Sequence, residues 1–410
     1  MEYNKIIQGD TLKVLKTLPD EIINCCVTSP PYWSLRDYGV EGQLGLEKTF
    51  EEYINKLCNI FDEVKRVLRK DGTCFVNLGD SYASNGGASR HFGYKDPKYK
   101  NGRAGNFIEP SAFKQSVQAK SLCLIPQRFA IEMVNRGWIL RNTIIWHKPN
   151  CMPSSVKDRF TVDFEYLYFF VKSKKYWFEQ QFEPHTYIDN RPSGMARQGK
   201  KYRDKVKGKY SDTNYGGNGI SFRGHSGYLK ADGTSMINPK GRNKRTVWKI
   251  PTKPFPEAHF AVFPEALIET PIQAGCPRYV CKKCGKAREK IIEIDRSKCK
   301  IQKWDELEDK LSNKVEHNLE SDLHKRKNIS GIFAYSIGAE RKEIGLTDCG
   351  CNAGFEPGIV LDPFMGAGTT AKVALKQGKK YLGIELKQEY IDMANKRIKA
   401  IPLKLELFNE

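Results

Sequence analysis

The 410-residue sequence lacks any apolar run that approaches the ~18 residues needed for a membrane-spanning helix. Residues 1–5 also lack the apolar core of a signal peptide. Acidic side chains are scarce relative to basic ones, because 48 Asp and Glu stand against 68 Lys and Arg, which leaves a net charge of +20. We therefore expect a cytoplasmic protein with no membrane partner, and the charge favours an anionic partner.

Low-complexity composition is absent as well. A 40% hydrophobic share with 28% charged residues excludes disordered, collagen-like and coiled-coil classes. At ~150 residues per domain, the length predicts two or three folded units. Disulfides are expected mainly in secreted proteins, so we interpret six scattered cysteines as small buried apolar side chains. These are Cys25, Cys26, Cys58, Cys74, Cys123 and Cys151.

Apolar stretches alternate with helical patterns over much of the chain. In the first 80 residues the pattern predicts strands at 3–8, 22–27 and 73–78 and helices at 11–18 and 50–68. This alternation favours an α/β fold with a doubly wound sheet. A helix at 126–135, strands at 139–147 and 164–172 and a helix at 264–268 follow, with a long loop at 84–120 between the two groups. Residues 285–345 are charged and partly helical in pattern, for example at 304–311.

The excess charge is concentrated in residues 191–250. This segment has 15 Lys or Arg and 3 acidic residues, a local charge of +12, with six interleaved aromatic side chains. Basic groups that neutralise phosphates and rings that stack on bases are typical of a nucleic-acid surface, although a merely solvated basic loop is the alternative. The candidate DNA contacts are Arg197, Lys200, Lys201, Arg203, Arg223, Arg242, Lys244 and Arg245.

A sequence motif that is typical of nucleoside-binding sites lies in residues 359–385. An apolar strand at 359–361 runs into the turn Asp362-Pro-Phe-Met-Gly-Ala-Gly, and a helix is predicted at 369–377. The next strand, 381–384, ends at Glu385, close to the ~20-residue offset from Asp362 at which an acid meets ribose hydroxyls. The turn has neither Gly-x-Gly-x-x-Gly nor Gly-Lys-Thr, so a nucleoside without a cradled pyrophosphate is favoured.

A second motif, Thr28-Ser-Pro-Pro-Tyr-Trp33, follows the buried strand 22–27. Ligands bind at this edge of open α/β sheets. Two consecutive prolines remove two backbone donors, which leaves carbonyls and the Ser29 hydroxyl as acceptors beside the rings of Tyr32 and Trp33. This arrangement suits a planar group with an amine, and the alternative is a Pro-Pro turn with core aromatics.

Together and in this order, the two motifs resemble the DNA amino-methyltransferases that use S-adenosylmethionine, in their beta-type arrangement. Residues 9–10, 145–149, 243–248, 259–264 and 381–385 are similar to further stretches of that family. The resemblance implies a Rossmann-like methyltransferase sheet in permuted order, with Ser29, Pro30, Pro31 and Tyr32 as the catalytic residues. The implied cofactor-binding residues are Asp10, Thr28, His259, Phe260, Ala261, Phe263, Asp362, Pro363, Phe364, Gly366, Gly368, Thr369, Thr370 and Glu385.

The resemblance also implies roles for these residues. The turn after Asp362 would bind the methionine part of the cofactor, Glu385 the ribose and Asp10 the adenine side, while the segment around Phe260 would close the pocket. A flipped base would reach Ser29, whose hydroxyl would accept an amine hydrogen during direct in-line methyl transfer. No proline precedes a cysteine in this sequence, which disfavours cytosine carbon-5 methylation. Serine in the motif resembles cytosine-N4 enzymes, and adenine-N6 remains the alternative.

Four cysteines suggest a metal site. Cys281 and Cys284 form a Cys-x-x-Cys-Gly knuckle, and Cys349 and Cys351 would complete a tetrahedral structural zinc site. Because the two pairs are far apart in the sequence, Cys276 and Cys299 are possible substitute ligands. The alternative hypothesis is that these cysteines are reduced thiols in a loop and bind no metal.

We predict a catalytic part at 1–180, a basic target-recognition region at 181–250, a cofactor-binding part at 251–275 and 352–410, and a small zinc-binding insertion at 276–351. The expected partner is duplex DNA in a nucleoid-associated location, with a cognate restriction endonuclease as a functional partner. A zinc-dependent nucleic-acid-binding protein without catalysis and an RNA or protein amino-methyltransferase are the other hypotheses.

Overall fold

A computed structural model describes residues 2–34, 42–83, 117–184, 241–253, 262–295 and 340–401. The chain divides into two compact units. The first unit comprises Met1–Gln181, Lys244–Arg288 and Asp348–Glu410, and the second comprises Phe182–Asn243 and Glu289–Thr347. Several predicted segments lie outside the described residues, including most of the loop at 84–120, nearly all of the basic segment and the helix at 304–311.

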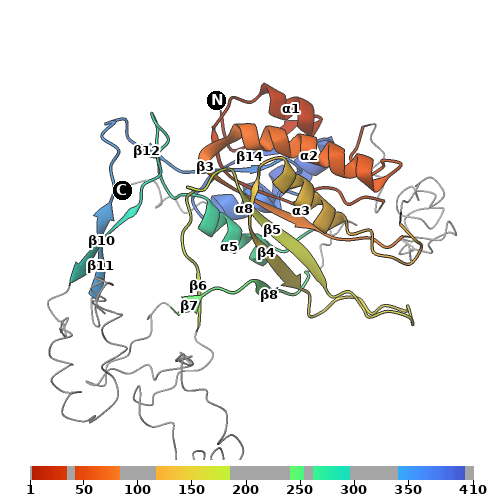
Figure 1. The fold of residues 1–410 in the computed structure, drawn as a ribbon. Coiled ribbons are helices and arrows are strands. Elements are labelled where there is room, and N and C mark those ends of the chain that lie inside the picture. The colour runs from red at the N-terminus through yellow and green to blue at the C-terminus, as the bar shows by residue number, and fades with distance from the viewer. Residues whose placement is uncertain are drawn as a thin grey trace, which may run out of the picture. The chain divides into compact units, whose positions relative to one another are not determined.

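The first unit is built on an eight-stranded sheet with the order β1-β14-β13-β2-β3-β5-β4-β8 (Figure 1). The strands from β1 to β3 in this order pair in parallel, β5 pairs antiparallel with both β3 and β4, and β8 is parallel to β4. The predicted doubly wound α/β fold is therefore confirmed. The strand bounds are β1 Lys5–Gln8, β2 Ile23–Thr28, β3 Leu68–Leu78, β4 Ile139–His147, β5 Phe164–Val171, β8 Val247–Lys249, β13 Ile359–Asp362 and β14 Lys380–Glu385.

Helices cover both faces of this sheet. On one face, α1 (Thr11–Thr17), α2 (Phe50–Val67) and α3 (Ile125–Asn135) contribute to one hydrophobic cluster. On the other face, α5 (Glu265–Gly275) and α8 (Thr369–Lys376) contribute to a second cluster, and α9 (Gln388–Lys399) packs against α8, β1 and β14. Two buried faces explain the continuous apolar runs, because every residue of β2 is buried.

Local sequence accounts for the position of α2 at the sheet. Thr49 accepts a hydrogen bond from the Glu52 backbone at 3.1 Å, which caps the helix N-terminus. Buried side chains such as Phe50, Leu57 and Phe61 recur at helical spacing and fill the first cluster. Cys25, Cys26, Cys58, Cys74 and Cys123 are buried as predicted, and Cys151 is partly exposed.

Three elements differ from the sequence prediction. Helix α5 continues to Gly275 through Pro271, whereas the prediction ended it at residue 268. Helix α9 follows β14 and was not predicted, because charged residues dominate its sequence and only Ile391 and Ala394 are buried. Strand β3 begins at Leu68, five residues before the predicted start at residue 73, and its continuous buried run extends from Gly72 to Leu78.

The second unit contains two antiparallel pairs among its described residues. β10 (Lys290–Asp295) pairs with β11 (Glu340–Leu346), so these parts of the segment predicted to be partly helical are strands. β6 (Phe182–Glu183) pairs with β7 (Arg242–Asn243), and the Arg242 Nε lies 2.8 Å from Glu183 Oε1. Within the described ranges, no helix is long and apolar enough to cross a membrane.

The order in which strands are added to the sheet reverses between β13 and β2, although the two strands are parallel. From β13, helix α8 leads outward to β14 along one face, whereas from β2, helix α2 leads outward to β3 along the other face. The carboxyl ends of β13 and β2 therefore lie at a topological switch point, where open α/β sheets bind ligands. The residues that follow these two strands are the two motifs singled out in the sequence.

Candidate functional site

A cavity of about 540 Å³ lies in the first unit at the carboxyl ends of the parallel strands. Segments that follow β1, β2, β13 and β14 all contribute to its wall. The lining includes Asp10, Ser29, Pro30, Pro31, Tyr32, Asn77, Trp146, Lys148, Glu165, Phe263, Pro363, Phe364, Gly366, Thr369, Glu385 and Tyr390. The structure thus brings the Ser-Pro-Pro-Tyr motif and the glycine turn into one cavity.

The Asp362 carboxylate points into the protein rather than into this cavity. Its Oδ1 accepts from the Thr28 hydroxyl at 2.6 Å and from the Phe364 backbone N–H at 3.0 Å. Its Oδ2 accepts from the Thr370 hydroxyl at 2.6 Å. Thr28 ends β2 and Thr370 lies in the first turn of α8, so one buried carboxylate fastens the ends of both central strands to a helix.

Burial dominates the electrostatics of this group. Desolvation raises the pKa of Asp362 to about 6, while the Thr28 and Thr370 hydroxyls and the Phe364 N–H act in the opposite direction. The Glu385 carboxylate adds a smaller upward contribution to the pKa of Asp362. Asp362 therefore shapes the turn, and residues 363–367 line the cavity.

Glu385 stands at the end of β14 with its carboxylate held by backbone donors. Its Oε2 accepts from the Gly366 N–H at 2.8 Å, and its Oε1 accepts from the N–H groups of Leu386 and Lys387, each at 3.0 Å. Burial raises the pKa of Glu385 despite these bonds. A carboxylate offers about four acceptor positions, so a hydroxyl of a ligand in the cavity can still donate to Glu385.

The Ser-Pro-Pro-Tyr motif follows β2, and hydrogen bonds and packing contacts hold it in place. The Tyr53 hydroxyl donates to the Pro31 carbonyl at 2.8 Å, and the Tyr32 ring packs so closely on Gly79 that a Cβ there would lie 2.7 Å from the ring. The Tyr32 hydroxyl donates to Glu165 Oε2 at 2.7 Å. Ser29 and the Tyr32 ring edge are thereby presented to the cavity.

Of the two rings expected beside the acceptors, Tyr32 or Trp33, only Tyr32 lines this cavity. Trp33 is only 1% exposed and packs edge-on against Phe50 with ring centroids 5.9 Å apart. Its Nε1 donates to the Glu47 carbonyl at 2.9 Å. An indole with its one donor satisfied in the core is a packing residue, so Tyr32 is the ring of this motif that borders the cavity.

Asp10 and the segment before α5 border the cavity at other points. The Asp10 side chain accepts from the Lys13 backbone at 2.9 Å and caps α1, and Phe263 lines the cavity. His259, Phe260 and Ala261 lie outside the described residues. The Gly368 backbone has φ +78°, and a Cβ there would lie 2.7 Å from the Ala394 Cβ, which explains the glycine at the N-cap of α8.

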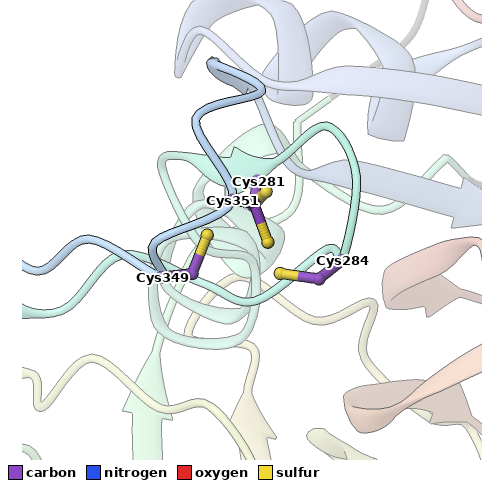
Figure 2. Close-up of side chains that lie close together, drawn as sticks. All are labelled: Cys281, Cys284, Cys349 and Cys351. Atoms are coloured by element: carbon purple, nitrogen blue, oxygen red, sulfur yellow. The ribbon is translucent and has the colours of Figure 1, made fainter.

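Four cysteines of the first unit converge on one point (Figure 2). The Sγ atoms of Cys281, Cys284, Cys349 and Cys351 all lie within 4.8 Å of one another. Backbone N–H groups of Cys284 and Lys283 lower the pKa of Cys281 to about 6, whereas the neighbouring thiols raise the pKa of Cys351 to about 12. Four such sulfurs are the ligand set of a structural zinc site, and a dication would stabilise the thiolates that otherwise repel one another.

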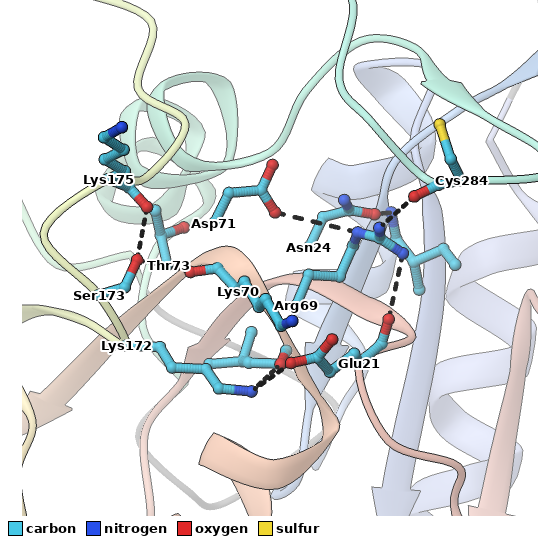
Figure 3. A network of polar contacts seen from close by, with 12 residues as sticks. Glu21, Asn24, Arg69, Lys70, Asp71, Thr73, Lys172, Ser173, Lys175 and Cys284 are labelled. Atoms are coloured by element: carbon cyan, nitrogen blue, oxygen red, sulfur yellow. Dashed lines mark hydrogen bonds and ion pairs between the residues drawn. The ribbon is translucent and has the colours of Figure 1, made fainter. Parts of the chain in front are cut away.

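Hydrogen bonds fasten this cluster to the sheet (Figure 3). The Arg69 guanidinium in β3 donates to the Cys284 carbonyl at 2.9 Å and to the Glu21 carbonyl at 3.1 Å. Asp71 lies 3.9 Å from the same guanidinium. Cys276, a candidate substitute ligand, is instead fully buried in the second hydrophobic cluster, and Cys299 lies outside the described residues.

Most of the predicted DNA contacts cannot be placed. Arg197, Lys200, Lys201, Arg203 and Arg223 lie outside the described residues. Of the others, Arg242 pairs with Glu183 in the second unit, and the Lys244 Nζ lies over the Trp248 ring in the first unit, 4.9 Å from its centroid. The Arg245 carbonyl accepts from the Trp248 Nε1 at 2.6 Å.

Comparison with known proteins identifies the family. The family model for N6/N4 DNA methylases matches residues 23–286 and 353–396, which include both cavity motifs. This chain belongs to the N6/N4 DNA methylase family. The Type II methyltransferases M.Cfr9I of Citrobacter freundii and M.SmaI of Serratia marcescens are 31% and 32% identical to it over 394 residues, which is 96% of this chain in both cases and 87% and 90% of the relatives.

Among solved structures, the PvuII DNA methyltransferase (cytosine-N4-specific) matches 99% of this chain and 89% of its own, with 15% identity and a TM-score of 0.48. The family model and the Type II methyltransferase relatives together make this chain a DNA methyltransferase of the N6/N4 family. The sequence-based assignment to the amino-methyltransferases is confirmed.

The sequence missed one side of the methyltransferase cavity. Asn77, Lys148 and Glu165 line it from β3 and the β4–β5 hairpin, and Lys148 Nζ is paired with Glu165 Oε1. Lys148 also lies over the Trp146 ring, 4.5 Å from its centroid. The family resemblance of residues 145–149 was the available signal for Trp146 and Lys148, whereas nothing in the strand sequence 164–171 distinguishes Glu165 from an exposed strand residue.

Proposed function

We propose that this methyltransferase transfers a methyl group from S-adenosylmethionine to the exocyclic N4 amine of cytosine in duplex DNA. The observation that supports the proposal most directly is the common cavity, in which Ser29, Pro30 and Tyr32 face the same space as the 363–367 turn and Glu385. A flipped base and a nucleoside-type methyl donor can meet in such a space. The transfer is direct and in line, since the motif supplies acceptors and no cysteine nucleophile.

The residues of the cavity fit this methyl donor. Glu385 keeps a free acceptor position for a ribose hydroxyl, and Asp10 and Tyr390 border the same part of the lining. The 363–367 turn exposes backbone to the cavity, while Asp362 behind it is saturated by three donors. When bound, S-adenosylmethionine supplies an electrophilic methyl group.

Ser29 and the Pro30 carbonyl would hold the amine of the target base. An exocyclic amine is a weak nucleophile because its lone pair is delocalised into the ring. Acceptors for its two hydrogens favour a pyramidal nitrogen whose lone pair is free to attack, and fixed acceptors cost no reorganisation during the reaction. A serine hydroxyl at this position resembles cytosine-N4 enzymes, which is the basis for choosing cytosine.

Adenine-N6 methylation is the second candidate, because the family model spans both target amines. The deciding experiment incubates purified enzyme with duplex DNA and labelled S-adenosylmethionine, followed by mass spectrometry of the nucleosides. We expect N4-methylcytosine from the wild type and its formation at a rate about 10²-fold lower from Ser29→Ala. Detection of N6-methyladenine alone would overturn the choice of cytosine.

We further propose that the 181–250 region is the target-recognition region. It binds duplex DNA through its basic side chains, including Arg242, Lys244 and Arg245. The catalytic part at 1–180 and the cofactor-binding part at 251–275 and 352–410 would surround the cavity. A cognate restriction endonuclease would share the recognition sequence, and a nucleoid-associated cytoplasmic location follows from the substrate.

Finally, we propose a structural zinc ion in the cysteine cluster at the base of the 276–351 insertion. The mutual approach of the four sulfurs supports this assignment. Metal analysis of the purified enzyme should give one zinc per chain, and Cys281→Ser and Cys349→Ser should each lower that content. Cys276→Ser is the matched control, since Cys276 is buried away from the cluster, and full zinc in both ligand variants would refute the site.

A further inference from the structure

Glu165 occupies a position in the cavity that the methyl-transfer chemistry described above does not use. It lies in β5, and its carboxylate is largely buried, with 17% of the side chain exposed. The Tyr32 hydroxyl donates to Oε2 at 2.7 Å, and the Lys148 ammonium donates to Oε1. A carboxylate that is bound by a tyrosine and a lysine at the wall of a reaction cavity is a candidate for a role in the reaction.

The reaction itself leaves a proton without an acceptor. An amine that gains a methyl group becomes cationic and must lose one proton before it is a neutral product. The Ser29 hydroxyl and the Pro30 carbonyl are both weak bases, so neither can hold this proton at neutral pH. Lys148 already donates to Glu165 and cannot accept it.

The cavity wall connects the Ser-Pro-Pro-Tyr motif to Glu165. The Tyr32 hydroxyl donates to Glu165, and Ser29 of the same motif lines the cavity together with Tyr32 and Glu165. The Ser29 side chain partly opposes the rise in the pKa of Tyr32. Burial and the Glu165 charge raise the pKa of Tyr32 well above its usual value, so Tyr32 stays protonated and can only relay a proton. The remaining carboxylate oxygen is held by Lys148, which fixes the orientation of Glu165.

We propose that Ser29, Tyr32 and Glu165 form a proton relay that removes a proton from the target amine while the methyl group is transferred to it, with Glu165 as the final acceptor. This inference rests on the proposed role of Ser29. As the lone pair of the amine nitrogen bonds to the methyl group, one N–H bond breaks, its electron pair stays on nitrogen, and the proton bonds to Ser29 Oγ. The Ser29 hydroxyl proton passes to Tyr32, and the Tyr32 phenolic proton bonds to Glu165 Oε2. The amine becomes neutral and Glu165 becomes a neutral acid, which later releases its proton to water.

The relay assigns Lys148 a positioning role. Its ammonium keeps Glu165 aimed at Tyr32 and stacks on Trp146, and it does not touch the transferred proton. Asn77 is fixed beside them, because its Nδ2 donates to the Tyr166 carbonyl at 3.0 Å, and its Oδ1 lies 3.3 Å from the Tyr32 hydroxyl as the more distant acceptor for the same phenolic proton.

The test measures single-turnover methyl transfer on duplex DNA, together with binding of S-adenosylmethionine and of DNA. General-base assistance is typically worth 10² to 10⁴-fold, so Glu165→Gln and Tyr32→Phe should each slow the transfer step by about 10²-fold or more. Binding of both substrates should change by less than about threefold. The matched control is Asp163→Asn, an exposed acid of the same hairpin that pairs with His147, which should retain the wild-type rate.

Two further measurements separate a relay from a structural effect. In a relay the double variant Tyr32→Phe with Glu165→Gln is no slower than the slower single variant, because both remove the same path. Formate should restore at least about tenfold of the rate of Glu165→Ala. A wild-type rate in Glu165→Gln, or multiplicative effects without formate rescue, would overturn the relay. A wild type that methylates adenine would leave the relay standing and overturn only the choice of cytosine, whereas an inactive wild type would overturn the proposed function.

Discussion

Substituting Asp362 by asparagine gives a sharp test of how the cavity is built. The wild-type carboxylate is 1% exposed and is held by the hydroxyls of Thr28 and Thr370 and by the Phe364 N–H. Asparagine keeps the shape and one acceptor oxygen, and the Thr370 hydroxyl can rotate to accept from the new amide. The variant therefore removes a buried charge while retaining the contacts between β2, β13 and α8.

The expected magnitude follows from the pKa. Burial raises the pKa of Asp362 from 3.8 to about 6, so folding favours the neutral acid. The corresponding stabilisation is fully present below the unfolded pKa and is lost as the pH rises through the folded pKa. With about 1.4 kcal/mol for each pH unit, the ionised group costs about 3 kcal/mol above about pH 7 and about 1 kcal/mol near pH 4.5.

Asp362→Asn should therefore gain about 2 kcal/mol relative to wild type between about pH 4.5 and about pH 7.5. The assay is urea unfolding followed by tryptophan fluorescence, since Trp33, Trp138, Trp146 and Trp248 are buried in the first unit. Glu389→Gln, which removes an exposed acid of α9, serves as the control and should not reproduce this gain. A stability difference that stays constant or shrinks as the pH rises would refute the assignment of a raised pKa to Asp362.

Three further outcomes are expected. Ser29→Ala should lower the single-turnover rate by about 10²-fold or more, because an acceptor for the target amine is lost, while calorimetry shows unchanged S-adenosylmethionine binding. Arg69→Met should cost about 1 to 3 kcal/mol of stability by leaving the Cys284 carbonyl without its charged donor, with zinc content unchanged by metal analysis; the exposed Lys70→Met is its control. The affinity for duplex DNA should fall linearly with salt on a double-logarithmic plot, and a flat dependence would contradict a phosphate-gripping basic region.

Periodicity predicted the elements whose burial is set by local pattern. The apolar run of β2 and the helical spacing of α2 needed no knowledge of their partners. Helix α9 was not predicted because few of its residues are buried. The length of α5 was underestimated because Pro271 interrupts the helical pattern, whereas the packing of Leu267 and Ile272 in the core stabilises the helix. Strand β8 has three residues, and only its pairing with β4 makes it a strand.

The sequence likewise predicts some features of the candidate site and not others. That Ser29 and the glycine turn share a cavity follows from placing both after parallel strands of one sheet. Side-chain direction does not follow from that placement, so the inward carboxylate of Asp362 and the burial of Trp33 were not predictable. Glu165 reaches the cavity because β5 runs antiparallel to β3, which brings the start of a later strand beside the end of an earlier one.

The order of the two motifs along the chain is immaterial to this geometry. β2 and β13 pair at Cys25 with Val360 and at Cys26 with Leu361, and the hydrogen bond from Thr28 to Asp362 joins residues 334 positions apart. One strand pair and one buried carboxylate thus suffice to bring the catalytic motif to the cofactor motif. The intervening chain needs only to return to the sheet, which leaves it free to carry the second unit and its basic segment. Because the bond between Thr28 and Asp362 helps to hold the two motifs in register, its loss should impair methyl transfer even though both residues lie outside the cavity lining.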